Sequence, residues 1–230
     1  MSHIPRERQV SRLDRYAPVA FVYETIEACY GLGAIGRAKA ACRDYFRAGE
    51  RVLLVGVGAG GELASLLETG VSVSAVDRSP AMLRRAQRRM RTFLRNRPQI
   101  QEPQWIQADF LDWRAERPFD HVVVHFFLNL FEAPALTAVF KRLGDVLKTG
   151  GHLHLADFAC PRPGFGGLLQ KGYWYVPLLA AFVITGEPIH RPYNYEAWLA
   201  GAGLRRRQMR FFAPLPGIPV GFQAITAVKV

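Results

Sequence analysis

Residues 51–61 decide the fold, because the apolar run Arg-Val-Leu-Leu-Val breaks into the closely spaced glycines of Gly-Val-Gly-Ala-Gly-Gly. A second apolar run, 71–76, ends at Asp77. Glycine lets a backbone turn sharply and approach a ligand where a Cβ would obstruct it. An acid at the end of the next strand can accept hydrogen bonds from both hydroxyls of a ribose. The series therefore predicts a nucleotide-like ligand held on a parallel sheet.

The glycines alone do not indicate which nucleotide-like ligand is bound. Gly61 follows Gly58 at the dinucleotide spacing, so the loop does not exclude NAD, whereas its Gly-Gly-Glu ending disfavours ATP and GTP. The segments that follow are more specific. In 76–83, Val-Asp-Arg-Ser-Pro-Ala-Met-Leu, Ser79 is placed to cap a helix and Pro80 to begin it. Three further segments are Ile-Gln-Ala-Asp-Phe at 106–110, Phe-Asp-His-Val-Val-Val-His-Phe-Phe at 119–127, and the run at 147–158 that contains Thr149-Gly150-Gly151.

In order and spacing, these segments resemble the motifs of class I S-adenosylmethionine (SAM) dependent methyltransferases over residues 50–160. The resemblance implies SAM as cofactor, with the loop glycines around its methionine and ribose, and Asp77 on the ribose hydroxyls. It also implies that Met82 packs on the adenine, that Asp109 accepts from the adenine amino group, and that His125 lines the cleft. The implied cofactor-binding residues are Gly56, Gly58, Gly60, Asp77, Arg78, Met82, Asp109, Phe110, His125 and Phe126.

One position departs from the pattern of the family. The family usually has an acid two residues before the first glycine, where it helps to orient the amino-acid end of the cofactor. This chain has Leu54 there. Either another group takes that role, or the cofactor is used in a different way.

Composition bounds the class of protein. A chain of 230 residues, half of them hydrophobic, is most simply one domain with a full core. Its three cysteines are widely spaced, which fits a reducing cytosol and predicts neither a disulfide framework nor a metal site. The first twenty residues contain no apolar core of a secretory signal. We therefore expect a cytoplasmic protein.

The net charge of +11 comes mostly from arginine. Arg84, Arg88, Arg91 and Arg95 are spaced to share one face of the helix after Pro80, and more arginines stand at 205–207 and 210. Such a face is either a solvated helix surface or a contact for anionic lipid or nucleic acid. Because no nucleic-acid-binding module is visible, we expect at most a peripheral contact with an anionic membrane. The oligomeric state stays open.

Strands and helices alternate along the chain. Strands are expected at 51–56, 71–76, about 103–107, 120–126, 152–158, 204–212 and 221–229, and helices at about 61–69, 80–96 and 134–147. The expected fold is α/β, a Rossmann-like doubly wound sheet of seven strands, mostly parallel with an antiparallel C-terminal strand. In the single domain 1–230, residues 1–48 form an N-terminal helical cap and 159–203 a substrate-side insertion. In such sheets the ligand lies beyond the carboxyl ends of the strands.

Methyl transfer needs aligned reactants, exclusion of water and, for a protonated acceptor, a base. His125 is favoured as the base because it ends the fourth strand, over His152, His154, Asp157 and His190. His152 and His154 alternate with leucines and so face the same way. Aromatic residues in the flanking segments favour an apolar, ring-bearing substrate. The predicted substrate-binding residues are Tyr23, Tyr30, Tyr173, Trp174, Tyr193 and Tyr195, and Tyr175 lies in the same run.

The layout is similar to that of quinone-biosynthesis methyltransferases and bacterial phospholipid N-methyltransferases. The leading hypothesis is therefore methyl transfer to a hydrophobic small molecule, quinone-like or another lipid. A second is an enzyme of the rhodoquinone-forming type, which resembles quinone methyltransferases yet uses SAM as an amino donor. A third is a protein that binds SAM or nucleic acid without catalysis.

Overall fold

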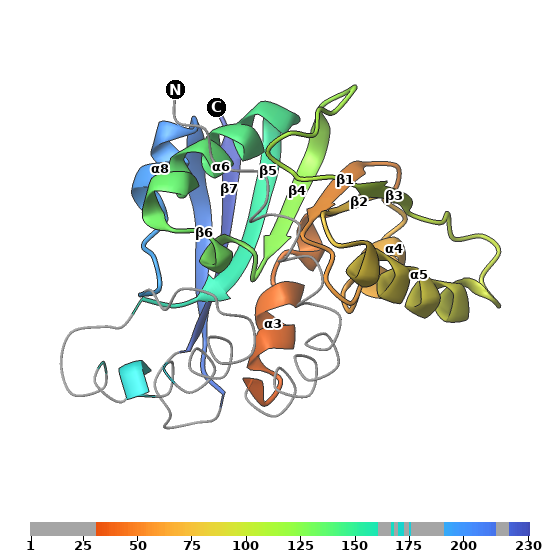
Figure 1. Ribbon diagram of the computed structural model, residues 1–230, viewed down its shortest axis with the longest axis horizontal. Helices are drawn as coiled ribbons and strands as arrows, with labels where there is room; N and C mark the ends of the chain where they lie inside the picture. Colours follow the sequence, from red (N-terminus) through yellow and green to blue (C-terminus); the bar gives the residue numbers. More distant parts are fainter. Residues whose placement is uncertain (1–30, 161–166, 168–169, 173–174, 176–190, 215–220) are drawn as a thin grey trace, which may run out of the picture.

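The computed structural model describes residues 31–160, 191–214 and 221–230, together with Gly167, Gln170, Lys171, Gly172 and Tyr175. Its centre is a seven-stranded sheet in the order β3-β2-β1-β4-β5-β7-β6 (Figure 1). The strands are β1 Arg51–Val55, β2 Ser72–Asp77, β3 Gln104–Gln107, β4 Phe119–His125, β5 Leu147–Phe158, β6 Leu204–Phe212 and β7 Phe222–Lys229. β1 to β5 pair in parallel, and β7 is antiparallel to both of its neighbours. The expected fold class is confirmed.

The helical elements are α3 Ala34–Ala40, η1 Arg43–Tyr45, α4 Leu63–Leu67, α5 Pro80–Leu94, η2 Leu128–Leu130, α6 Ala133–Val146 and α8 Glu196–Gly201. Most bounds lie within two residues of those expected. β5 differs, since it begins at Leu147 rather than at 152 and therefore includes the Thr149-Gly150-Gly151 turn signal. α4 is also shorter than the 61–69 expected.

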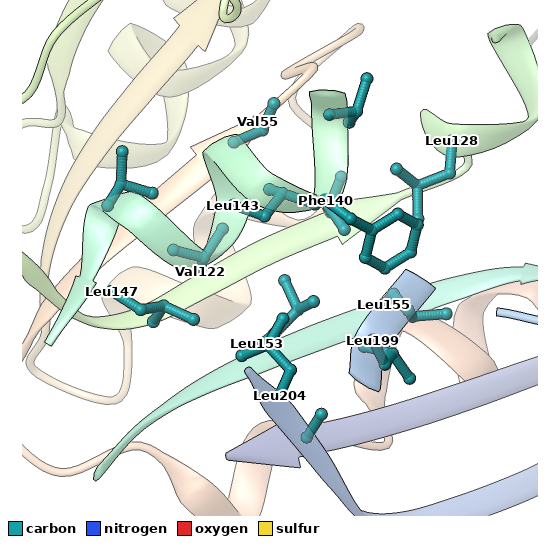
Figure 2. Packing of buried hydrophobic residues seen from close by; sticks show 14 of the residues in the cluster. Val55, Val122, Leu128, Phe140, Leu143, Leu147, Leu153, Leu155, Leu199 and Leu204 are labelled. Carbon is teal, nitrogen blue, oxygen red and sulfur yellow. The ribbon is translucent and has the colours of Figure 1, made fainter. Parts of the chain in front are cut away.

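Alternate side chains of the strands build two cores on opposite faces of the sheet. Leu53 of β1 and Val122 and Val124 of β4 pack with α6 and α8. Figure 2 shows this side, where Phe140 and Leu143 of α6 lie over the strands. On the other face, Leu54 packs with residues of α4 and α5 and with Cys42 and Phe46, which flank η1. Burial on both faces explains why these strands are nearly continuous apolar runs.

α5 follows the expected helix start. The hydroxyl of Ser79 accepts a hydrogen bond from Met82 N at 3.3 Å, and Pro80 occupies the first helical turn. Leu83, Ala86 and Met90 face the core. The four arginines at 84, 88, 91 and 95 are all exposed, and the helix contains no acidic residue. The solvent face of α5 is therefore strongly basic.

A second group of exposed arginines lies on β6, at 205, 206, 207 and 210. α5 packs against β2 and β3, and β3 and β6 are the two edges of the sheet. The two basic regions are consequently on opposite sides of the molecule (Figure 1). Among the described residues, no helix is long and apolar enough to cross a membrane.

Candidate cofactor site

The glycine loop directly follows β1 and is held against its neighbours. Gly56 has φ 73°, and its N–H donates to the Val76 carbonyl at 2.9 Å. A Cβ on Gly56 would lie 2.6 Å from Cδ2 of Phe127. Gly58 also has a positive φ, 53°, but apart from its chain neighbours no group of the described residues lies within 4 Å of the Cβ position. The loop is thus tightly packed at Gly56 and open at Gly58, which leaves room for a ligand beside its backbone.

Asp77, at the end of β2, is tied to this loop. Its carboxylate accepts from Gly58 N at 3.1 Å and from Ser79 N at 2.8 Å. Burial raises the pKa of Asp77 above its usual value, against the opposing effect of these bonds and of Arg78. Each oxygen can accept a further hydrogen bond. The geometry therefore leaves Asp77 able to serve the ribose role that was predicted for it.

The predicted adenine residues lie at the ends of β2 and β3. Met82 is half-buried in the first turn of α5. Asp109 closes a turn after β3, where its carboxylate accepts from Leu111 N at 3.0 Å. Phe110 is 4% exposed and belongs to the core under α6, where it meets Phe127 edge to face. Phe110 therefore supports this part of the site from below.

His125, the last residue of β4, forms a hydrogen bond that the sequence did not predict. Its Nδ1 lies 2.5 Å from Oε2 of Glu62, which directly follows the glycine loop, and both side chains are largely buried. Burial alone would raise the pKa of Glu62, but His125 and Lys39 reverse this effect and lower it. A carboxylate can only accept, so Nδ1 of His125 carries a proton and Nε2 is the remaining nitrogen.

The next residue, Phe126, has a positive φ of 51°, which is uncommon for an aromatic residue. Its N–H donates to the Ala156 carbonyl at 2.8 Å. The ring meets Phe158 and Phe222 at centroid distances of 5.6 and 5.9 Å, and Lys39 Nζ of α3 lies 5.5 Å from its centroid. The chain turn after β4 thus directs an aromatic group toward α3.

His152 and His154 face the same way, as expected, and stack 6.0 Å apart. They join a buried network away from the glycine loop. His154 contacts His121 at 3.1 Å and Thr226 at 3.0 Å, and His121 contacts Glu50 at 2.9 Å. These side chains lie beneath η1 and the aromatic rings of residues 45 and 46. Within the described residues, no three His, Cys, Asp or Glu side chains are placed to hold a metal ion.

The structure places two of the predicted substrate residues. Tyr195 is 1% exposed and its hydroxyl donates to Asp157 at 2.8 Å, so it lies in the core rather than on an open surface. Tyr193 is half-buried and donates to the Phe131 carbonyl at 3.2 Å. The other predictions, Tyr23, Tyr30, Tyr173 and Trp174, together with His190, lie outside the described residues.

The carboxyl ends of β1 to β4 thus bring together a glycine loop that is open at Gly58, the two acids Asp77 and Asp109, and a buried acid–histidine pair. Residues 52–151 match the family model of the methyltransferase domain. This part of the chain is therefore similar to a methyltransferase domain, and the fold is the one seen in SAM-dependent methyltransferases, as the sequence predicted.

The chain is similar in sequence to two methyltransferases of known name. The chain is 28% identical over 160 residues to the demethylmenaquinone methyltransferase of Tropheryma whipplei (strain Twist), a match that covers 69% of this chain and 63% of the relative. It is 27% identical over 163 residues to the ubiquinone biosynthesis O-methyltransferase of Xanthomonas euvesicatoria pv. vesicatoria, covering 69% and 64%. The match thus spans less than two thirds of these relatives' length.

A solved structure shares the fold over nearly the whole chain. The magnesium protoporphyrin IX methyltransferase of Synechocystis PCC 6803, crystallised with S-adenosylhomocysteine (SAH), has a TM-score of 0.71 and 17% identity, and the match covers 97% of this chain and all of that one.

Proposed function

We propose that the protein is a SAM-dependent methyltransferase whose acceptor is a hydrophobic, ring-bearing small molecule of the quinone type. The observation that carries the proposal is the position of the buried His125–Glu62 pair between the glycine loop and the aromatic group around Phe126. The relatives named as methyltransferases of demethylmenaquinone and of ubiquinone biosynthesis support this acceptor class.

The site residues fit the cofactor. Gly58 leaves the loop backbone open, and Asp77 has free acceptor capacity beside it. Asp109 lies beyond β3, where the adenine amino group would be bound, with Met82 on the neighbouring helix. When bound, SAM supplies an activated methyl group whose loss leaves a neutral thioether.

His125 serves as the base in this proposal. Glu62 accepts the proton of Nδ1, fixes the ring and leaves Nε2 to receive a proton. Nε2 would take up the proton that the acceptor loses when it receives the methyl group. Such a role requires the acceptor beside the end of β4, and the partly buried rings of Phe126 and Phe158 offer an apolar wall there.

The protein acts in the cytoplasm, at the inner face of the membrane where an apolar acceptor resides. The exposed arginines of α5 support such a peripheral contact, because basic residues are attracted to anionic headgroups.

The test is incubation of the purified protein with methyl-labelled SAM and a reduced demethylnaphthoquinone in detergent, followed by organic extraction. We expect labelled quinone, and much less label with the variant Asp77→Ala at a SAM concentration below saturation. An unlabelled quinone that gains an amino group would instead indicate the aminating reaction, and the absence of any modified quinone would contradict the proposed acceptor.

A further inference from the structure

Glu62 is a largely buried acid, and only one of its two carboxylate oxygens has a role in the proposed function of His125 as base. Its Oε2 is bound to His125, and no hydrogen bond to Oε1 accompanies it within the part of the chain that the structure describes. The side chain is 13% exposed, so the carboxylate is not sealed into the core. A carboxylate in such surroundings is costly unless its oxygens are bound. Oε1 is therefore available to a donor on a bound ligand.

Glu62 directly follows the glycine loop, and the next residue, Leu63, packs with Leu54 on one face of the sheet. Cys42 belongs to the same cluster, and burial, followed by the negative charge of Glu62, raises its pKa to about 12. Cys42 packs in one cluster with Leu54, Val57 and Leu63. Glu62 thus brings a negative charge from the loop to the region where β1 itself supplies only the apolar side chain of Leu54.

A positive charge lies within electrostatic reach of this acid. Lys39 of α3 helps to lower the pKa of Glu62, and its Nζ lies over the ring of Phe126. A buried acid and a lysine therefore lie near the glycine loop. Opposite charges held close to one another suit a zwitterion, and the amino-acid end of SAM has both an ammonium and a carboxylate group.

We propose that Oε1 of Glu62 binds the ammonium group of the cofactor and that Lys39 attracts its carboxylate group. His125 then has two roles, since it holds Glu62 in place and faces the acceptor. The inference rests on the proposed function, because it assumes SAM in the cleft. It assigns the recognition of the amino-acid end to residues of the glycine loop and of α3.

Two ligands distinguish binding of the amino-acid end of the cofactor from a change that weakens binding at the whole site. SAH has the amino-acid group, whereas 5′-methylthioadenosine has the same nucleoside and sulfur without it. Titration calorimetry of Glu62→Gln should show SAH affinity reduced about ten- to hundredfold, the loss of one charge-assisted hydrogen bond, and unchanged affinity for methylthioadenosine. Retained methylthioadenosine binding also shows that the variant is folded.

Matched variants complete the test. Glu68→Gln removes an exposed acid at the end of the same helix, which pairs with Arg43 on the surface, and should change neither affinity. Asp77→Asn should weaken both ligands, because it acts on the ribose. Lys39→Met should weaken SAH alone, and an unchanged SAH affinity would remove the lysine from the proposal.

The outcomes distinguish the two proposals. A wild-type protein that binds neither ligand would overturn the proposed function and, with it, the role of Glu62. A wild-type protein that binds both, with Glu62→Gln indistinguishable from it or equally weakened toward both, would overturn the role of Glu62 alone.

Discussion

The network around His154 makes folding stability depend on pH. Burial, followed by the charges of His121, His152 and His125, holds the pKa of His154 well below its usual value of 6.5. Its ring is 1% exposed and bonded to His121 and Thr226, so folding keeps it neutral where an unfolded chain would bind a proton. Below pH 6.5 the unfolded state binds more protons, and stability must fall with pH.

The decrease in the free energy of unfolding can be calculated from the usual pKa of histidine in the unfolded chain. For one histidine that stays neutral in the folded state, lowering the pH from 7.5 to 5.5 destabilises the fold by about 1.4 kcal/mol. Half-buried His152, whose pKa is also lowered, adds a smaller loss of the same sign. The carboxyls of Glu62 and Asp120 have lowered pKa values, and they lose their stabilising effect only under more acidic conditions. The pKa of Asp77 is raised, so its contribution to folding stability increases as the pH falls.

A comparison of the wild type with His154→Gln isolates this contribution, because the other groups titrate in both proteins. Urea unfolding at pH 7.5, 6.5 and 5.5, followed by tryptophan fluorescence, gives the free energy of unfolding. We expect the wild type to lose about 1.4 kcal/mol more than the variant over this range. Equal losses in the two proteins would refute the reasoning, whatever the difference in their absolute stabilities.

Three further predictions concern the cofactor, the core and the surface. Asp77→Ala should weaken SAM binding more than about tenfold, because two ribose hydrogen bonds to a charged group are lost; unchanged affinity in calorimetry would remove Asp77 from the site. Tyr195→Phe should lower the free energy of unfolding by about 1–3 kcal/mol, because the buried carboxylate of Asp157 loses the phenolic hydroxyl that donates to it. Tyr193→Phe removes a hydrogen bond to a backbone carbonyl and should lower the free energy of unfolding by less than about 1 kcal/mol. Urea unfolding curves that shift equally for the two variants would contradict this prediction. Changing the four arginines of α5 at 84, 88, 91 and 95 to Gln should reduce the amount of protein that sediments with phosphatidylglycerol vesicles at low salt about tenfold or more. An equal reduction when the four arginines of β6 are changed instead would argue against a specific contact through α5.

The sheet was predictable from sequence because its signals are local. Each buried strand is an apolar run, and the Ser79-Pro80 pair marks the start of α5 with its own hydrogen bond. The long β5 was less clear, because the exposed residues 148–150 at its start read as a turn. Their strand conformation comes from tertiary pairing that propensity does not register.

The cofactor site was predictable only where its residues follow strands in a recognisable order. Glu62 was missed, because its partner His125 is 63 residues away and nothing in Gly-Gly-Glu-Leu indicates that the acid turns inward. The same limit applies to Tyr195. An aromatic residue in a polar segment gives no sign that its hydroxyl meets a buried carboxylate such as Asp157. Contacts between distant segments determine both side chains.

The exposed arginines of α5 and of β6 lie on opposite sides of one sheet. A flat anionic surface can meet only one side of the molecule at a time, so a molecule adsorbed through α5 still presents the four arginines of β6 to the solution. It can then attract a second surface and join two vesicles. Turbidity that rises with protein concentration and falls again on addition of salt would report this bridging.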